Sequence, residues 1–488
     1  MTEDKEFRIL ICLIEVWDDD GANAIPVHSQ TDKITEVESV EISESFAQVI
    51  DTAKIRFPRG TVMRQTMAQS ETDPVIQFDA NRMISYVKEG AKIAGTADFS
   101  VGRRIAIRLG YTDDPKIVSL TKASEQKNIF NDQAAYDEYC AAMNYLFVGF
   151  ITQCSTEEPI EIKCENLAYV LRSVMVPNIG SMDDITVNYL FSPDGDSSLP
   201  EPRNTEKPDL LEGTGLELHP DVKAMKLSAG KYTPDRTISV YELLSSWGKK
   251  LLHSFVARDG NKDYLLVAQS YFSTNGYDSV AKMAQIGHSQ ELCEIDFGID
   301  VANNGLTLTQ IDPYKLCVRG TGRDKDGKLL HVTVALTPPA EAEEKGPIRV
   351  LKSDQISKKK SKTGTPTDRV DLSKYTVLQY QSDKTYEEKS ETQKDGSVVN
   401  QPPLYWLAQD AGIYLINYNK TGLDGTLTLF GDYGSDVLYS GGRVHLVDER
   451  HPAKNGVYVV GEIITRFGVN GYRRAIKLPY CLKLDSDQ

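Results

Sequence analysis

A short pattern of residues occurs twice in this chain, once near the start and once near the end. Gly102–Ile107 reads GRRIAI and Gly441–Leu446 reads GGRVHL, and both are typical of a glycine turn that leads into a strand. Farther along, Phe147–Thr152 reads FVGFIT and Val459–Thr465 reads VVGEIIT. Because the matched runs keep their order, we interpret them as two copies of one antiparallel β unit. Chance is the alternative, since strands that begin with a glycine and a basic residue are common.

The duplication makes a specific prediction about two glycines and one insertion. Gly149 and Gly461 lie in the second run of each copy. We expect them at equivalent places, where a missing side chain permits a close strand approach or a bulge. The first copy is longer because it contains the extra segment 112–144. Residues 132–143 within that segment have apolar side chains at helical spacing, which predicts a helix there.

The rest of the chain alternates between β-rich and mixed regions. Before residue 165, five runs are either apolar throughout or alternate between apolar and polar residues, as strands do. These runs are 7–14, 52–57, 102–111, 145–154 and 160–164. In the middle region, apolar residues have helical spacing at 165–174 and at 239–253. Residues 192–236 between these two segments are polar and are predicted to form a long loop. In the last region strands return around a polar linker at 337–372 and a predicted helix at Leu404–Tyr418.

These patterns predict an α+β, mainly β chain with three domains. Residues 1–164 form the first antiparallel β domain, with the helical insertion near 112–144. Residues 165–290 form an α+β domain. Residues 291–488 form the second antiparallel β domain, into which a loop and helix segment at 337–423 is inserted.

Charge, cysteine usage and hydropathy limit the class of protein. The 488 residues include 55 Lys and Arg against 70 Asp and Glu, a net charge of −15. That balance is unfavourable for general nucleic-acid binding, although a like-charged surface lets a polyanion slide past. The seven cysteines are scattered without a CxxC pair, which indicates synthesis in a reducing cytosol. The apolar run Ile9–Ile14 is too short for a signal peptide or a membrane span, so we expect no membrane anchor.

The sequence contains no recognisable motif for catalysis or for binding a cofactor or metal. A phosphate-binding loop, a dinucleotide fingerprint, a nucleophile elbow and an HExxH helix are all missing. His445 and His451 have no standard metal-ligand spacing, so we interpret them as polar residues that flank a hairpin. Lys358–Lys362 is interpreted as a solvated, flexible loop rather than a phosphate-binding segment. We therefore expect no enzyme activity, no cofactor and no metal.

Several runs at the two ends of the chain carry a family resemblance. Those near the C-terminus are Gly425–Asp432, Ser440–Leu446, Asn455–Val460 and Phe467–Arg474. Those near the N-terminus are Thr52–Arg59, Leu109–Tyr111 and Phe147–Gly149. Together they resemble the tail-hub proteins of bacteriophages and related contractile injection systems. The resemblance implies that the motif positions are structural, and these are Pro58, Arg59, Gly110, Tyr111, Gly149, Asn455, Gly456, Tyr458, Gly461, Gly471, Tyr472 and Arg473.

The resemblance implies a structural baseplate hub protein of a virion tail, synthesised in the bacterial host cytoplasm. Three copies would form a ring in which each chain contributes two tube-type antiparallel β-barrels that bracket the α+β domain. The ring would adapt a sixfold tail tube above to a threefold spike or tail-tip proteins below, with DNA passing through its pore. We expect acidic residues to face that pore in part. The alternatives are a tail-associated peptidoglycan hydrolase and a receptor- or glycan-binding tail module.

Overall fold

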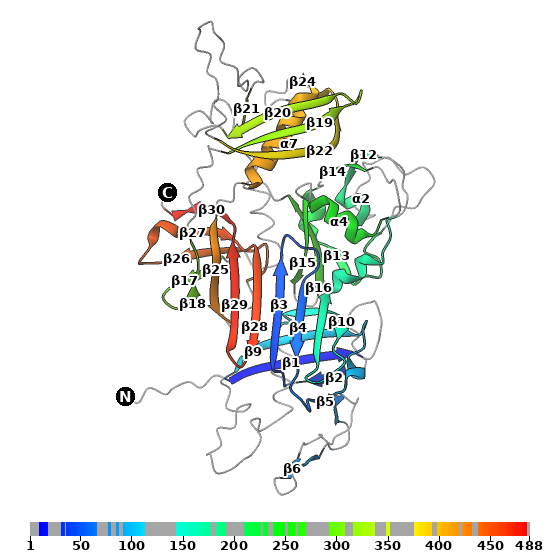
Figure 1. The fold of residues 1–488 in the computed structure, drawn as a ribbon, viewed down its shortest axis with the longest axis vertical. Helices are drawn as coiled ribbons and strands as arrows, with labels where there is room; N and C mark the ends of the chain where they lie inside the picture. The colour runs from blue at the N-terminus through cyan, green and yellow to red at the C-terminus, as the bar shows by residue number, and fades with distance from the viewer. Residues whose placement is uncertain are drawn as a thin grey trace.

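The computed structural model describes residues 9–17, 31–34, 36–65, 77–79, 84–86, 91–112, 143–176, 182–191, 209–225, 228–232, 238–248, 252–259, 262–269, 292–307, 316–336, 348–351, 375–392, 398–418, 422–431 and 438–485. The fold is mainly β, and its largest element is one curled antiparallel sheet of thirteen strands (Figure 1). From one edge to the other, the order is β18 (Val301–Asn304), β25 (Leu423–Phe430), β29 (Gly471–Leu478), β28 (Glu462–Gly468), β3 (Ser39–Ser45), β4 (Thr52–Arg56), β11 (Glu161–Asn166), β10 (Phe147–Cys154), β9 (Arg104–Thr112), β1 (Ile9–Trp17), β2 (Thr31–Ile34), β5 (Val62–Gln65) and β8 (Ala91–Ile93).

The N-terminal part of this sheet curls around its own apolar core. Alternation along the strands produces the core, because every second side chain points inward, as in β4 with Ala53 and Ile55 buried between exposed neighbours. The short helix η1 (Thr96–Phe99) adds Phe99, which stacks on Phe57 with ring centroids 4.9 Å apart. A small separate hairpin is formed by β6 (Gln77–Asp79) and β7 (Ile84–Tyr86).

The C-terminal part of the sheet shares a second core with a smaller sheet. That sheet has the order β17 (Cys293–Asp296), β26 (Arg443–Val447), β27 (Gly456–Val459) and β30 (Tyr480–Leu484), with the short helix η6 (Pro452–Lys454) between β26 and β27. Ile295 and Leu446 from the smaller sheet pack with Leu429 and Ile476 from the large one. The two sheets therefore pack around one apolar interior.

The region between the two β parts is a mixed α and β domain. It contains η2 (Leu167–Arg172), β12 (Met182–Thr186), α2 (Val187–Phe191), β13 (Leu216–Leu218), α3 (Pro220–Met225), β14 (Ser228–Tyr232), α4 (Val240–Gly248), β15 (Leu252–Asp259) and β16 (Lys262–Gln269). Its strands pair as β13-β16-β15 and β12-β14. Trp247 on α4 packs edge-on against Phe191 on α2, with centroids 6.1 Å apart. The core of this region also includes Trp17, Ala106, Val148 and Phe150 from β1, β9 and β10, so it is shared with the first β part.

A further α and β domain is inserted between β18 and β25. Its elements are β19 (Leu316–Asp324), β20 (Leu329–Leu336), β21 (Ile348–Leu351), β22 (Thr376–Tyr386), β23 (Lys389–Thr392), β24 (Val398–Gln401) and α7 (Pro403–Tyr418). The sheet order is β21-β20-β19-β22, and α7 covers one face of it (Figure 1). The inserted region thus begins earlier than the predicted segment 337–423, because β19 and β20 pair with β21 and β22 rather than with strands of the second core.

Local sequence patterns predicted some elements correctly and misplaced others. The helix predicted at Leu404–Tyr418 is confirmed as α7. The helix predicted at 239–253 ends at Gly248, because β15 begins at Leu252 and pairs with β16 along its length. The predicted loop 192–236 contains β13, α3 and β14. At 165–174 the chain first completes β11, and Asn166 then caps the 3-10 helix η2 through its side-chain oxygen, 3.1 Å from the Ala168 N–H.

Two sequence predictions fall largely outside the described residues. They are the helix at 132–143 and the lysine run Lys358–Lys362. Within the described part of the chain, no helix combines the length and the apolar character that a membrane crossing requires.

Candidate functional site

The two β parts of the chain repeat one strand order. The first β unit consists of β1, β3, β4, β9, β10 and β11, and the order in space is β3-β4-β11-β10-β9-β1. The second β unit consists of β17, β18, β25, β26, β27, β28 and β29, where β27 and β28 act as one strand that bends between the two sheets. Its order in space is β18-β25-β29-β28/β27-β26-β17. Corresponding strands of the two units, matched by their order in the chain, therefore take the same places in space. One direction differs, because β17 runs parallel to β26 while β1 runs antiparallel to β9.

The backbone hydrogen bonds of the repeated runs also match. The Gly102 N–H donates to the Ile151 carbonyl over 2.8 Å, and the Gly441 N–H donates to the Val460 carbonyl over 2.7 Å. Both glycines have positive φ angles, 94° and 87°, which residues with a side chain rarely adopt. The glycine in each copy therefore forms the turn that starts β9 and β26. This agreement supports the interpretation of the repeat as a duplication.

The predicted equivalence of Gly149 and Gly461 is wrong. In the strand pairing, Gly149 lies opposite Ile105, and the residue in the same place of the second unit is Tyr458, opposite Val444. Gly461 lies farther along, where the strand bends. The two glycines avoid different clashes: an added Cβ would lie 2.0 Å from the Glu165 carbonyl oxygen at Gly149, but 2.6 Å from the Pro479 ring at Gly461.

The candidate functional site is the joint where the two units meet edge to edge. Strand β28 of the second unit pairs with β3 of the first along its whole length, from Gly468 opposite Ser39 to Glu462 opposite Ser45. Figure 1 shows β25, β29, β28, β3 and β4 side by side, although β3 and β28 come from opposite ends of the chain. Strands β18, β25, β29 and β28 of the second unit thus continue the sheet of the first unit without interruption.

Aromatic side chains anchor the second unit in the core of the first. Phe467 and Tyr472 stand at the end of the β28–β29 hairpin, and both belong to the apolar core of the first β unit. The Tyr472 N–H donates to the Tyr111 hydroxyl over 3.2 Å, and the two rings lie 5.9 Å apart. The joint is therefore held by buried apolar contacts as well as by strand pairing.

The exposed face of the joined sheet carries alternating charges in cross-strand pairs. Glu41 on β3 accepts a hydrogen bond from Arg466 on β28 over 2.8 Å, and this ion pair crosses the joint. Similar pairs connect neighbouring strands, Lys54 with Glu161 at 3.0 Å and Lys477 with Glu462 at 2.5 Å. Such exposed pairs contribute little stability, roughly 0–1 kcal/mol each. They make this face mixed in charge rather than acidic.

Buried polar groups lie behind the joint, where both units meet the middle domain. The Asp51 carboxylate accepts hydrogen bonds from the Ser45 N–H over 3.1 Å and from the Asn166 amide over 2.9 Å. Burial raises the pKa of Asp51 well above its usual value, and the charge of Glu44 raises it further. Burial also raises the pKa of Glu44, while the Arg474 guanidinium lowers it. The carboxyl groups are thus harder to ionise in the folded chain.

Raised pKa values predict that folding stability falls as pH increases. Above the ordinary glutamate pKa of 4.5 the unfolded chain loses the Glu44 proton while the folded chain still binds it, so the free energy of unfolding decreases until the folded group also ionises. We expect Glu44→Gln to remove part of this slope. Urea unfolding between pH 4.5 and pH 8 measures how the free energy of unfolding changes with pH. The control is Glu41→Gln, at an exposed position on the same strand. Parallel pH profiles for Glu44→Gln and the wild type would contradict the prediction.

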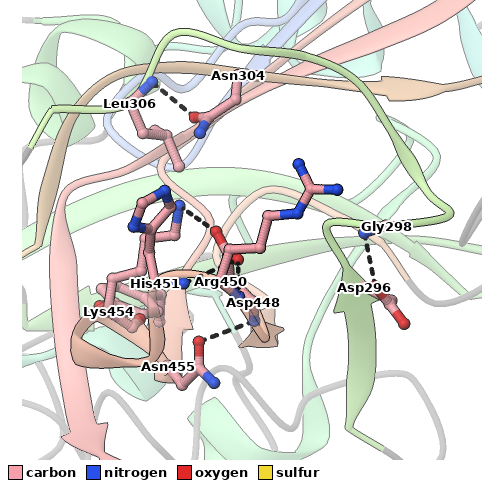
Figure 2. A network of polar contacts seen from close by, with 10 residues as sticks. Asp296, Gly298, Asn304, Leu306, Asp448, Arg450, His451, Lys454 and Asn455 are labelled. Atoms are coloured by element: carbon pink, nitrogen blue, oxygen red, sulfur yellow. Dashed lines mark hydrogen bonds and ion pairs between the residues drawn. The ribbon is translucent and has the colours of Figure 1, made fainter.

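A second polar network fixes the turn after β26. The Asp448 carboxylate accepts hydrogen bonds from the N–H groups of Arg450 and His451 over 2.9 and 3.1 Å, and it pairs with Lys454 at 2.7 Å (Figure 2). The Asn455 side chain accepts a hydrogen bond from the Asp448 N–H over 2.8 Å. Burial alone would raise the pKa of Asp448, but these hydrogen bonds hold it below its usual value.

The lowered pKa of Asp448 gives the opposite pH dependence. Its contribution to stability is present above the unfolded pKa and is lost as pH falls through the folded value. Asp448→Asn leaves donors of the turn without a charged acceptor, at a cost of about 1–3 kcal/mol near neutral pH. Thermal unfolding at pH 7 and at pH 3 tests this prediction. We expect the difference in melting temperature between the wild type and the variant to be smaller at pH 3 than at pH 7. An equal gap at both pH values would contradict the assignment.

The histidines of the predicted hairpin have carboxylate neighbours and no metal geometry. The His445 ring lies 3.0 Å from Asp485 and 3.5 Å from Glu294. His451 is exposed in the turn that Asp448 fixes. Among the described residues, no group of three or more His, Cys, Asp and Glu is arranged to hold a metal ion.

Comparisons with known proteins find matches only at the level of structure. No protein-family model matches the sequence, and no curated protein matches it. A 43 kDa tail protein of prophage MuSo2 from Shewanella oneidensis matches over 96% of this chain and 98% of its own, with 8% identity and a TM-score of 0.45. A tail protein from Neisseria meningitidis matches over 96% of both chains, with 10% identity and a TM-score of 0.46. These are tail proteins.

A protein of bacterial type VI secretion also matches the chain. The E. coli c3393 protein, a component of that secretion system, matches over 96% of this chain and 76% of its own, with 10% identity and a TM-score of 0.32.

The structure brings only some of the predicted motif residues together. Tyr111, Gly471, Tyr472 and Arg473 meet at the joint, and Arg473 stacks on Phe430 at 4.9 Å. A second group, Asn455, Gly456 and Tyr458, surrounds the Asp448 turn, where the Tyr458 hydroxyl donates to the Lys454 carbonyl over 2.8 Å. The other motif residues are dispersed. Pro58 and Arg59 form the turn after β4, and Gly110 lies against Met143. Gly149 and Gly461 lie at the two places described above, where an added Cβ would clash with neighbouring atoms.

Sequence reasoning missed the buried charged residues behind the joint. Arg474 is 2% exposed and donates to the Leu438 carbonyl over 2.7 Å, while Arg258 and Asp263 of the middle domain form an ion pair. The sequence did contain one signal for the burial of Arg474. It alternates with Tyr472 and Ile476 along β29, so all three side chains point to the same, inward face of the sheet. No comparable signal marks Asp51, which precedes β4.

Proposed function

We propose that the chain is a structural hub of a phage tail or a related injection particle, assembled as a ring of three copies. One observation carries this proposal: two β units of the same strand order are joined edge to edge in a single sheet. A joint of this kind, in which one edge meets a different edge, is heterologous, and its repetition generates a ring when the rotation closes. Three chains with two units each then present six nearly equivalent positions.

The proposed ring adapts between two symmetries. A tail tube of sixfold symmetry can rest on the six β units, each of which is a tube-type β-barrel in this proposal. The middle domain and the domain between β18 and β25 occur once per chain, so they give the ring threefold features suited to a spike or tail-tip protein. The pore would let DNA or another cargo pass, and the mixed-charge face of the joined sheet offers it no continuous basic track.

The hub needs no catalytic chemistry, and we propose that the chain has none. The Asp51 and Asp448 carboxylates are both engaged in structural hydrogen bonds. Clearing of peptidoglycan by the purified chain in a zymogram, abolished by substituting one carboxylate, would instead support the hydrolase alternative.

Native mass spectrometry of the purified chain at increasing concentration tests the oligomeric state. We expect a trimer in equilibrium with a folded monomer, since each monomer has its own cores. Electron microscopy of the trimer should show a central pore with six similar lobes around it. A dimer, or a monomer at all accessible concentrations, would overturn the ring.

A further inference from the structure

The order of strands in the large sheet identifies the edges that two copies would use. The large sheet begins with four strands of the second unit, in the order β18, β25, β29 and β28. The corresponding four strands of the first unit follow in the same order, as β3, β4, β11 and β10. The internal joint thus connects the last strand of one repeat, β28, to the first strand of the next, β3. Continuing the pattern would connect β10 of one copy to β18 of another.

Within the described part of the chain, β18 is an open edge, whereas β10 lacks a second partner strand only at its last residues, which lie beside η1. β18 is the terminal strand of the sheet, and its pairing is to β25 alone. In β10, Phe147–Phe150 pair with β9, and Gly149 and Phe150 also pair with β11, whereas Gln153 and Cys154 pair only with β11. The corresponding stretch of the second unit begins at Glu462, the residue where β28 starts to pair with β3.

We propose that the β10–β11 hairpin of one copy docks on β18 and its continuation Gly305–Thr307 in a second copy. This inference rests on the ring proposed above and specifies the joint between its chains. Gly305 and Thr307 extend the β18 edge by hydrogen bonds to Thr426 and Asp424, 3.0 and 2.7 Å long.

The edge at β18 is protected in a way that favours a specific partner. The strand is short, it has an irregularity in its pairing between Val301 and Asn303, and the Asn304 side chain accepts a hydrogen bond from the Leu306 N–H over 3.0 Å (Figure 2). Short and irregular edges resist indiscriminate strand addition. A partner must therefore bring further contacts beside the strand.

Charges at the tip of the docking hairpin supply such contacts. The internal joint has Tyr111 at the end of β9, where it meets the tip of the β28–β29 hairpin. In the second unit, β26 ends at Val447, and exposed Arg450 lies in the turn that follows it. The tip of the β10–β11 hairpin is acidic, with exposed Glu157 and Glu158. Arg450 of one copy would therefore meet these carboxylates of the next.

Charge reversal with restoration tests this joint. We expect the double variant Glu157→Lys with Glu158→Lys to weaken trimer formation at least about tenfold at low salt, and Arg450→Glu to do the same, because like charges then oppose each other. Combining all three substitutions should restore the trimer. The matched control reverses the adjacent exposed pair Glu387 and Glu388 in the domain between β18 and β25, and it should leave the trimer unchanged. Circular dichroism establishes that each variant is folded.

A cross-linking experiment keeps the test independent of charge. Gln153→Cys and Thr307→Cys are introduced together in a Cys154→Ser background and treated with a short bis-maleimide, which spans the roughly 7–8 Å of a diagonal cross-strand pair. Covalent trimers would support the joint. If the wild type is a trimer, but the double-cysteine variant forms no covalent trimer and the charge reversals leave the trimer unchanged, this joint is overturned and the ring stays intact. A wild-type chain that stays monomeric overturns the ring and the joint together.

Discussion

Replacing Gly149 with alanine is expected to destabilise the chain by more than about 4 kcal/mol, a size reserved for severe structural conflicts. The added Cβ would lie 2.0 Å from the Glu165 carbonyl oxygen and 2.9 Å from the Asn166 Cα. Both are backbone atoms of β11, which is paired on both sides, to β10 and β4. The backbone therefore cannot move away without breaking one of these pairings. Denaturant unfolding of the purified variant measures the loss of free energy.

Gly248 provides the control for this substitution. It ends helix α4, and an added Cβ there has no heavy atom within 4 Å. We expect Gly248→Ala to change the free energy of unfolding by no more than about 0.5 kcal/mol. If the two alanine variants unfold at the same denaturant concentration, the close approach of β10 and β11 at Gly149 is wrong.

Tyr472→Ala is expected to cost about 3–5 kcal/mol and to loosen the two β units from each other. The Tyr472 ring is fully buried, and it contacts Tyr111 of the first unit and Phe467 of its own hairpin at centroid distances of 5.9 and 6.0 Å. Its loss leaves a cavity under the joint. We therefore expect amide hydrogen exchange in β3 and β28 to accelerate more than exchange in β9 or β26.

The exposed tip of the same hairpin provides the comparison for Tyr472. Val469 is 91% exposed, so Val469→Ala removes few packing contacts and should leave both stability and exchange near wild-type values. Uniform acceleration of exchange throughout the chain by Tyr472→Ala would show that the ring supports the whole fold rather than the joint.

Local signals predicted the parts of the fold that depend on neighbouring residues. Gly102 and Gly441 mark turns with positive φ, and the strands after them follow from alternation in the sequence. The apolar spacing of Leu404–Tyr418 was sufficient for α7, because that helix packs one face on a sheet. By contrast, Gly149 and Gly461 looked equivalent because both occur in similar apolar runs, whereas their true positions depend on strand pairing.

The joint itself has no local signature. Glu41 and Arg466, which form an ion pair across it, are 425 positions apart, and either one alone resembles any charged residue on the exposed face of a strand. Tyr111 and Tyr472 were selected through the family resemblance, but their contact is a property of the tertiary fold. The buried Arg474 and Asp51 were not predicted because residue type favours the surface for both, and only long-range hydrogen bonds make burial acceptable.

The pairing of β28 with β3 also has a consequence for how quickly and how reliably a ring could assemble. Because both strands belong to one polypeptide, their association is intramolecular and does not depend on protein concentration. In the proposed trimer, half of the joints would already be made when each chain folds, and only the other half would require encounters between molecules. A ring of six separate single-unit chains would need every joint to form by collision. The fused arrangement would therefore assemble at lower concentrations and in fewer steps, and it would prevent rings with an odd number of units.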